Sequence, residues 1–393
     1  MGPSAPSFAA SAVERDATTT VEGLVTRAES RWAGGSIVTE STIRTDSGAE
    51  VEVVQLGGAV GDVGMWVSHS PPVLEPGYEV FAELRSARTQ SGEARWTLAD
   101  VAPPQASPDG QLPFVRTLTS NRTPIEWASG CVFITYHEDG TAHLPGDSEF
   151  HLLDTLFRRW ERDSVDCSYL RFRLMGRARH EVGFDGVNMV LFRHDRWCRP
   201  AVDDEPEICY SPSAAGLTTL FFINDPNSPH DGEILDADME LNGVDFAISS
   251  GGESLGQAAC QADIANTLAH EIGHLLGLDH TCWDGTSPRP NDHFGNPVPD
   301  CSRRDLPESI TEATMYAFQE CGETKKAQLT ADDIAGKCAI YAPELDPQSC
   351  EPVSIGGCCS LAAAGTHAEA TKGGAALALL GALALLGLRR RQA

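Results

Sequence analysis

Residues 270–280 read H-E-I-G-H-L-L-G-L-D-H, a stretch that contains three histidines and one glutamate. On an α-helix, residues four apart lie on one face, about 6 Å apart along the axis. His270 and His274 can therefore direct imidazole nitrogens at one metal ion, with Glu271 beside them. Two ligands from one helix leave a tetrahedral shell incomplete, so the pattern predicts a third ligand from outside the helix.

His280 supplies that third ligand, and Gly277, in the same stretch, lets the chain turn back toward the ion. Glycine lets the chain leave a helix through a positive-φ turn, which returns His280 toward the ion. Three neutral imidazoles with a fourth position open to water are typical of a catalytic zinc site and not of a structural one. The spacing therefore predicts a zinc hydrolase.

The residues around the histidines have helical periodicity. Between 259 and 278, apolar side chains recur at spacings of three and four, at Ile264, Leu268, Ile272 and Leu275. A bare H-E-x-x-H can occur by chance on a helix, where its histidines are merely surface or core residues. The added glycine and third histidine at fixed offsets make coincidence a poor explanation.

The extended pattern H-E-x-x-H-x-x-G-x-x-H resembles that of the metzincin metalloproteases. Downstream, A-T-M-Y-A places Met315 where metzincins have their Met-turn, a tight turn whose methionine forms an apolar floor beneath the histidines. Taken alone, Met315 would be interpreted as a flexible side chain that fills a gap in the core. Its position after the third histidine favours the Met-turn.

Other segments are similar to the matrixin subfamily over about residues 113–342. Residues 149–162 resemble the first matrixin helix, 216–223 the edge strand beside the active site, and 230–242 the following strand. Residues 329–341 resemble the closing helix, with Thr330 as its N-cap. The resemblance is specific only at the zinc helix and the Met-turn.

The resemblance implies a zinc-dependent endopeptidase in which Glu271 is the general base toward a zinc-activated water. A protein or peptide substrate would pair with the edge strand by β-augmentation, at Leu217, Thr218, Thr219, Leu220 and Phe221. The alternative is a catalytically weak surface adhesion or binding protein that keeps a metzincin zinc fold. The intact Glu271 favours the enzyme, and a cysteine-switch propeptide is not found.

The resemblance to matrixins also implies how many metal ions the protein binds. Animal matrixins hold a second zinc through histidines at positions where this chain has Thr219 and Leu235, so one zinc is expected. Asp236, Asp238 and Glu240 remain as a carboxylate cluster that could bind Ca²⁺. They could equally be the solvated face of an acidic strand.

The net charge and the cysteine content restrict the expected binding partners and the cellular compartment. A formal net charge of −27 over 393 residues argues against a nucleic-acid partner and against anionic membrane surfaces. Ten of the twelve cysteines lie between Cys131 and Cys350, and none forms a C-x-x-C pair. Disulfides in an exported protein are therefore expected. Loop proximity suggests two pairs, Cys198 with Cys209 and Cys282 with Cys301.

The C-terminal segment has the composition of a sorting signal. Residues 375–388 contain only Ala, Leu and Gly, and three arginines follow. This run is shorter than the ~20 residues of a permanent transmembrane helix. It resembles the myxobacterial C-terminal sorting tail (Myxo-CTERM type), which implies processing near Cys358 or Cys359 and attachment to the cell surface or outer membrane. The alternative is an ordinary anchor helix that stays in place.

These observations predict an α+β protein: a metzincin-like catalytic domain with a twisted mixed sheet, an active-site helix and a C-terminal helix, preceded by a small all-β barrel-like domain. Alternating residues at 19–21, 36–43 and 50–56 predict the strands of that first domain. The expected segments are 1–19 (export-signal remnant or disordered leader), 20–102 (β-rich module), 103–112 (linker), 113–345 (protease domain), 346–372 (linker with the cysteine sorting element) and 373–393 (short helix and Arg tail). A monomer is expected, in contact with the membrane and the sorting machinery only through its tail.

Overall fold

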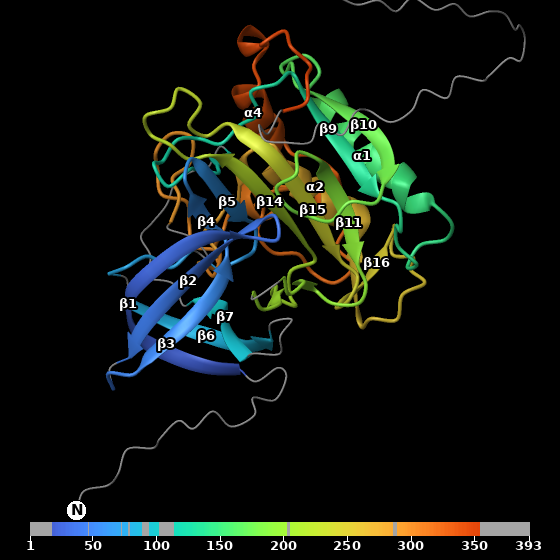
Figure 1. Ribbon diagram of the computed structural model, residues 1–393. Coiled ribbons are helices and arrows are strands. Elements are labelled where there is room, and N and C mark those ends of the chain that lie inside the picture. Colours follow the sequence, from blue (N-terminus) through green and yellow to red (C-terminus); the bar gives the residue numbers. More distant parts are fainter. Residues whose placement is uncertain are drawn as a thin grey trace, which may run out of the picture. The chain divides into compact units, whose positions relative to one another are not determined.

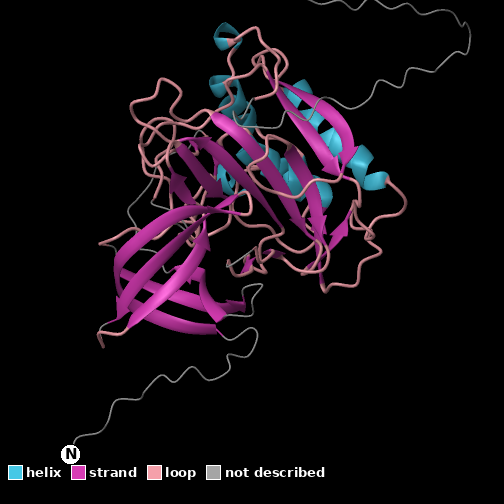
Figure 2. Ribbon diagram, in the orientation of Figure 1, coloured by secondary structure: helices cyan, strands magenta, loops and turns pink. Residues whose placement is uncertain are grey.

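The computed structural model describes residues 18–45, 47–71, 73–77, 79–88, 94–101, 114–202, 205–285 and 289–353. The described chain is a mixed α+β protein that is mostly sheet with few helices (Figure 2). The expected leader, the linker at 103–112 and the tail with Cys358 and Cys359 lie outside the described residues.

Five N-terminal strands form a closed barrel in the order β1-β2-β3-β7-β6 (Figure 1). Their bounds are β1 (Thr18–Ala33), β2 (Ser36–Thr45), β3 (Glu50–Leu56), β6 (Glu79–Arg88) and β7 (Ala94–Val101). Neighbours are antiparallel except β3 and β7, whose parallel pairing closes the barrel. Val25, Ile43, Val53 and Leu84 are buried inside it. The strands predicted at 19–21, 36–43 and 50–56 lie in β1, β2 and β3.

The structure also contains a seven-stranded mixed sheet, whose strands have the order β10-β9-β11-β15-β14-β5-β4 (Figure 1). Its strands are β4 (Gly58–Val60), β5 (Val63–Val67), β9 (Cys131–His137), β10 (Arg171–Ala178), β11 (Asn188–Arg193), β14 (Gly216–Ile223) and β15 (Ile234–Asn242). The pairings from β10 to β15 are parallel, and those from β15 to β4 are antiparallel. The strand expected at 216–223 is β14, and the one expected at 230–242 is shorter by four residues.

Strands β4 and β5 differ from the sequence-based division of the chain. The sequence predicted one β-rich module over 20–102, whereas residues 58–67 leave the barrel and complete the seven-stranded sheet. The physical reason is burial, because Met65 and Val67 enter a hydrophobic cluster with Leu217 and Phe221 of β14.

Strand β14 is buried on both faces, which is typical of a central strand and differs from the edge strand that the sequence predicted. Successive side chains point to opposite faces. Leu220 and Phe222 pack into the main core with the helices. Leu217 and Phe221 pack into the second cluster, together with Ile37 and Val54 from the barrel strands. The barrel and the sheet therefore share one apolar interface.

The helices are α1 (Ser148–Asp163), α2 (Ile264–Leu275), α3 (Glu308–Thr311) and α4 (Ala331–Ile340), with the 3-10 turns η1 (Lys325–Ala327) and η2 (Pro343–Leu345). Helix α1 agrees with the prediction over 149–162. Helix α4 agrees with the prediction over 329–341, and Thr330 and Asp333 form a capping box at its start. Apolar side chains of α1 and α2 share the main core with β14 and β15.

Helix α2 begins later than the pattern over 259–278 suggested. Residues 260–263 form a short strand, β17 (Cys260–Asp263), paired with β16 (Phe246–Ser249). Asp263 then caps the helix by accepting hydrogen bonds from the N–H groups of Ala265 and Asn266. The remaining short strands are β8 (Val115–Arg116), β12 (Cys198–Arg199), β13 (Ile208–Cys209) and β18 (Leu278–Asp279).

Five disulfides join the ten cysteines between Cys131 and Cys350. The two expected pairs, Cys198–Cys209 and Cys282–Cys301, are both formed. The others are Cys131–Cys350, Cys167–Cys338 and Cys260–Cys321. Such a framework indicates an exported or extracellular protein. Within the described ranges, none of the helices has the length and apolar character needed to cross a membrane.

Thiol titration of denatured, unreduced protein is expected to find none of these ten cysteines free. Removing the Cys131–Cys350 bridge, which closes a loop of 219 residues, by a double serine substitution should cost about 2–5 kcal/mol of unfolding free energy. Urea unfolding of the variant and the wild type measures this difference. Most of the ten thiols reacting in the unreduced wild type would contradict the disulfide framework.

Candidate metal centre

Three histidines converge, as the motif predicts. The Nε2 atoms of His270 and His274 are 3.1 Å apart, and that of His280 lies 3.3 Å and 3.2 Å from them. Four ligands about 2.0–2.1 Å from a tetrahedral zinc would lie roughly 3.3 Å from one another. The three nitrogens therefore already have the spacing that a shared ion requires.

The other ring nitrogen of each histidine has an acceptor. His270 Nδ1 lies 2.7 Å from the carbonyl oxygen of Thr314, and His274 Nδ1 lies 2.9 Å from that of Leu278. His280 Nδ1 lies 3.2 Å from a carboxylate oxygen of Asp284. A carbonyl only accepts, so in the neutral rings the first two Nδ1 atoms carry the proton, and their Nε2 lone pairs face each other. Buried lone pairs arranged in this way fit a bound cation.

Burial keeps the helical pair neutral. Removal from water, followed by the mutual effect of neighbouring imidazoles, lowers the pKa of His270 and His274 well below the usual range. Burial also opposes a charge on His280, but the hydrogen bond and the negative charge of Asp284 outweigh it and raise the pKa of His280. Neutral imidazole is the form that binds metal, so burial prepares the pair on α2 for this role.

Two glycines allow the close approaches on which the site depends. Gly277 has φ of 83°, and a Cβ there would collide with the carbonyl oxygen of Ile125. Its turn brings His280 back to the helix, as predicted. Gly273, on α2, leaves room for the sulfur of Met315. Met315 is buried against the histidine helix, which agrees with its predicted place in the chain.

Glu271 lies beside the three histidines and is almost fully buried. Its Oε2 accepts a hydrogen bond of 2.7 Å from the Thr218 hydroxyl and one of 3.4 Å from the Ser68 hydroxyl. Gly216, at the start of β14, allows the carboxylate to approach, because a Cβ there would lie 3.0 Å from Oε1. The carboxylate is thus held by Thr218 of β14 and by Ser68, which follows β5 in a distant part of the chain.

A fourth histidine, which the motif did not predict, completes the group. His69 follows β5, and one nitrogen from each of His69, His270, His274 and His280 lies within 4.8 Å of the other three. His69 Nε2 is 3.6 Å from Glu271 Oε1. These four residues form a buried cluster that could hold a metal ion. A second group, formed by Glu207 and the Cys198–Cys209 pair, offers no thiolate because its sulfurs are joined.

The predicted substrate edge is already paired. Leu217, Thr218, Thr219, Leu220 and Phe221 all lie in β14. The strand hydrogen-bonds to β15 on one side and to β5 on the other. The sequence predicted a free edge, and the structure fills it with another part of the same chain.

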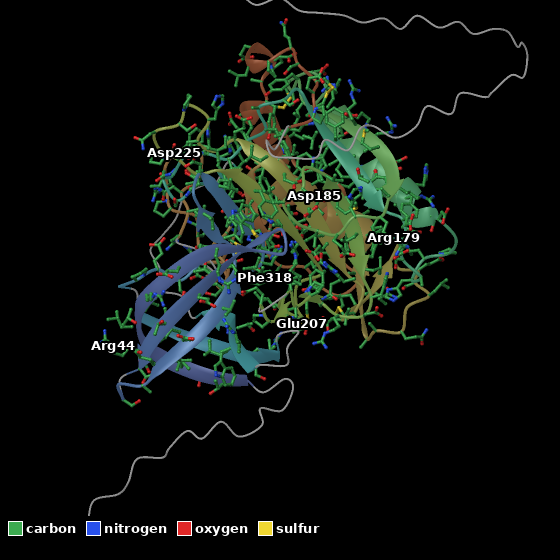
Figure 3. The ribbon with its side chains drawn as sticks, in the orientation of Figure 1. Arg44, Arg179, Asp185, Glu207, Asp225 and Phe318 are labelled. Carbon is green, nitrogen blue, oxygen red and sulfur yellow. A yellow bond between two sulfur atoms is a disulfide. The ribbon has the colours of Figure 1, made fainter. Side chains whose placement is uncertain are left out.

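The carboxylate cluster lies on the buried strand β15. Asp236 accepts from the N–H groups of Asp185 (labelled in Figure 3) and Gly186, at 2.7 and 2.8 Å. Asp238 accepts from two further backbone N–H groups, and Glu240 pairs with Arg193 and Arg199. These carboxylates are therefore buried, not the solvated face of an acidic strand. They are not among the described groups with metal-ligand spacing, so Ca²⁺ stays an untested prediction.

The chain matches no protein-family model and no curated protein.

Asp284 is expected to matter for metal affinity although it does not face the ion. Replacing it with alanine removes the acceptor that orients His280, and loss of such a partner typically weakens metal binding by about 10- to 100-fold. Competition with a chromophoric chelator measures the change. The matched control is Asp305→Ala, an exposed carboxylate outside the site. Equal affinity in the Asp284 variant and the wild type would remove Asp284 from the site.

Proposed function

We propose that this protein is a zinc-dependent endopeptidase of the metzincin, matrixin-like type, with a catalytic domain built on the seven-stranded sheet and α2, and a barrel domain before it. The observation that carries the proposal is the convergence of three buried imidazoles beside a buried carboxylate, Glu271. Two observations fit a bound zinc. The carbonyl partners of His270 and His274 favour a proton on Nδ1 and a lone pair on Nε2, and the three Nε2 atoms have the spacing of zinc ligands.

His270, His274 and His280 would hold the ion through Nε2. Bound zinc would supply Lewis-acid polarisation of a scissile carbonyl and would increase the acidity of water near neutral pH. Glu271 would accept the proton of the attacking water and deliver it to the leaving amine nitrogen. The Thr218 hydroxyl, 2.7 Å from Oε2, orients that carboxylate.

The substrate would be an extended peptide. Strand β14 would bind it through backbone hydrogen bonds on the edge that β5 occupies here. This mode of binding is tolerant of sequence, so side-chain specificity would have to come from the surrounding loops.

We also propose that the enzyme is exported and held at the cell surface after its tail is processed near Cys358 or Cys359. The five disulfides support export, and the apolar run with its arginines supports a sorting signal. An intact mass of the mature protein that still includes the three arginines at 389–391 would contradict the processing step.

Cleavage of casein and of a quenched peptide library by purified protein tests the central proposal. Hydrolysis should disappear with a zinc chelator and return when zinc is restored. The assay should be run on the wild type and on a His69→Ala variant, in which the fourth histidine is absent. Stoichiometric zinc binding without hydrolysis in either protein would favour the surface-binding alternative.

A further inference from the structure

The segment of residues 58–69, here called the covering segment, lies along the metal centre although it belongs to the N-terminal part of the chain. It contains β4, β5, Ser68 and His69. Strand β5 runs antiparallel to β14 in continuous register from Val63 opposite Ile223 to Val67 opposite Thr219. The Ser68 N–H then donates to the Thr218 carbonyl at 2.9 Å. An extended peptide therefore already occupies the edge of β14.

The end of the covering segment enters the site itself. The Thr218 N–H donates to the Ser68 hydroxyl at 2.7 Å, and that hydroxyl donates to Glu271. The ring of His69 lies 4.8 Å from that of His280 and 5.4 Å from that of His270, between centroids. Ser68 and His69 therefore lie directly against Glu271 and the three histidines.

His69 reaches this position through a strained backbone. Its φ of 54° lies in the left-handed region. For a residue other than glycine this conformation is strained and persists where the surroundings hold it. Such outliers gather at functional sites and ligand clamps. The turn places the imidazole of His69 beside the other three histidines.

Packing holds the covering segment against the sheet. Met65 and Val67 are buried in the cluster shared with the barrel. A Cβ on Gly64 would meet the ring of Phe222, so the strand fits closely against β14. The barrel is tied to the same region by the buried Arg199, which donates to the Ser36 hydroxyl of β2 at 2.6 Å.

We propose that the covering segment keeps the enzyme latent, with His69 as a fourth metal ligand in the position that water needs and β5 in the place of a peptide substrate. The proposal rests on the proposed endopeptidase function and adds its regulation. Displacement of residues 58–69 would free one metal position and the edge of β14 together. The bond from His69 to the metal would hold the segment in place, so losing that bond would increase the fraction of chains in which the edge of β14 is free. The fraction of chains with the segment displaced would then set the activity.

X-ray absorption of the full-length zinc protein tests the ligand set without any substitution. Four imidazoles per zinc are expected. Three imidazoles and one oxygen in the wild type would overturn the proposal, whatever the activity of the protein. This measurement does not depend on whether any variant folds.

The His69→Ala variant tests latency, with His230→Ala as the matched control because His230 is exposed and is not part of the metal group. His69→Ala should show three imidazoles and one oxygen, and a chelator should remove its zinc about tenfold faster or more. If fewer than one wild-type chain in ten is open, its peptide hydrolysis should rise at least about tenfold. His230→Ala should match the wild type in all three measurements.

The outcomes separate this inference from the function on which it rests. A wild type that hydrolyses peptides as fast as His69→Ala would overturn latency and leave the endopeptidase intact. Four imidazoles in the wild type and an opened position in His69→Ala, without hydrolysis by either protein, would confirm His69 as a ligand. That result would contradict the proposed endopeptidase activity, and the proposed latency would fall with it because latency rests on that activity.

Discussion

In a chain that carries His69→Ala, replacing Glu271 with glutamine is expected to lower kcat for peptide hydrolysis by about 10²- to 10⁴-fold while bound zinc stays at one equivalent. The amide is nearly isosteric with the carboxylate and can keep the hydrogen bond from Thr218, but it cannot accept the proton of the attacking water. The His69→Ala background is required because the covering segment contacts Glu271 in the wild type. Steady-state kinetics with a quenched peptide and zinc analysis of the same samples measure both quantities.

The control is Glu344→Gln, in the same background, because Glu344 is exposed and outside the site. It should not change kcat. Undiminished hydrolysis in the Glu271 variant would exclude this residue as the base. A loss of zinc along with activity would assign it a structural role instead.

The second large effect concerns metal binding and stability together. With both His69 and His274 replaced by alanine, two imidazoles remain, and stoichiometric zinc binding should be lost. A ligand present at 1,000 times its Kd stabilises the native state by about 4 kcal/mol. Loss of that stabilisation should lower the thermal midpoint by several degrees. Calorimetry with and without a chelator separates this loss from any direct packing effect of the substitution.

A chelator should shift the midpoint of the wild type and should not shift that of the double variant. His151→Ala, an exposed histidine on α1, is the matched substitution on a helix and should keep the full chelator shift. A chelator shift in the double variant equal to that of the wild type would mean that zinc stabilises the protein from another site.

Local signals explain the parts of the structure that could be predicted from the sequence. The three metal-facing histidines lie within eleven residues, and their relation depends on one helical spacing and one glycine, Gly277. Helix α1 and strand β14 likewise have patterns contained in their own residues. The periodicity over 259–278 predicts too early a start for helix α2, because Cys260–Asp263 pairs with a strand that this periodicity cannot reveal.

The fourth histidine could not be found in this way. His69 lies in W-V-S-H-S-P-P, 201 residues before His270, and no spacing rule connects the two positions. The only local hint is that it follows directly on a short apolar strand, β5. The pairing of that strand with β14 is a tertiary contact, and an alternating pattern does not specify its partner. Asp284 had a weak signal, an acidic residue four positions after His280.

The pairing of β5 with β14 also has a consequence for how the chain folds. The Thr218–Ser68 hydrogen bond joins residues 150 positions apart, and contacts of such long range slow folding. During synthesis and export, the first three barrel strands can pair with their neighbours as soon as they emerge, because β1–β2 and β2–β3 are local hairpins. Strand β5 must wait for residues 216–223, and until then its apolar side chains and open edge are available to other chains. The contact that covers the metal centre can therefore form only after residues 216–223 have been made, and β5 is exposed to aggregation until then.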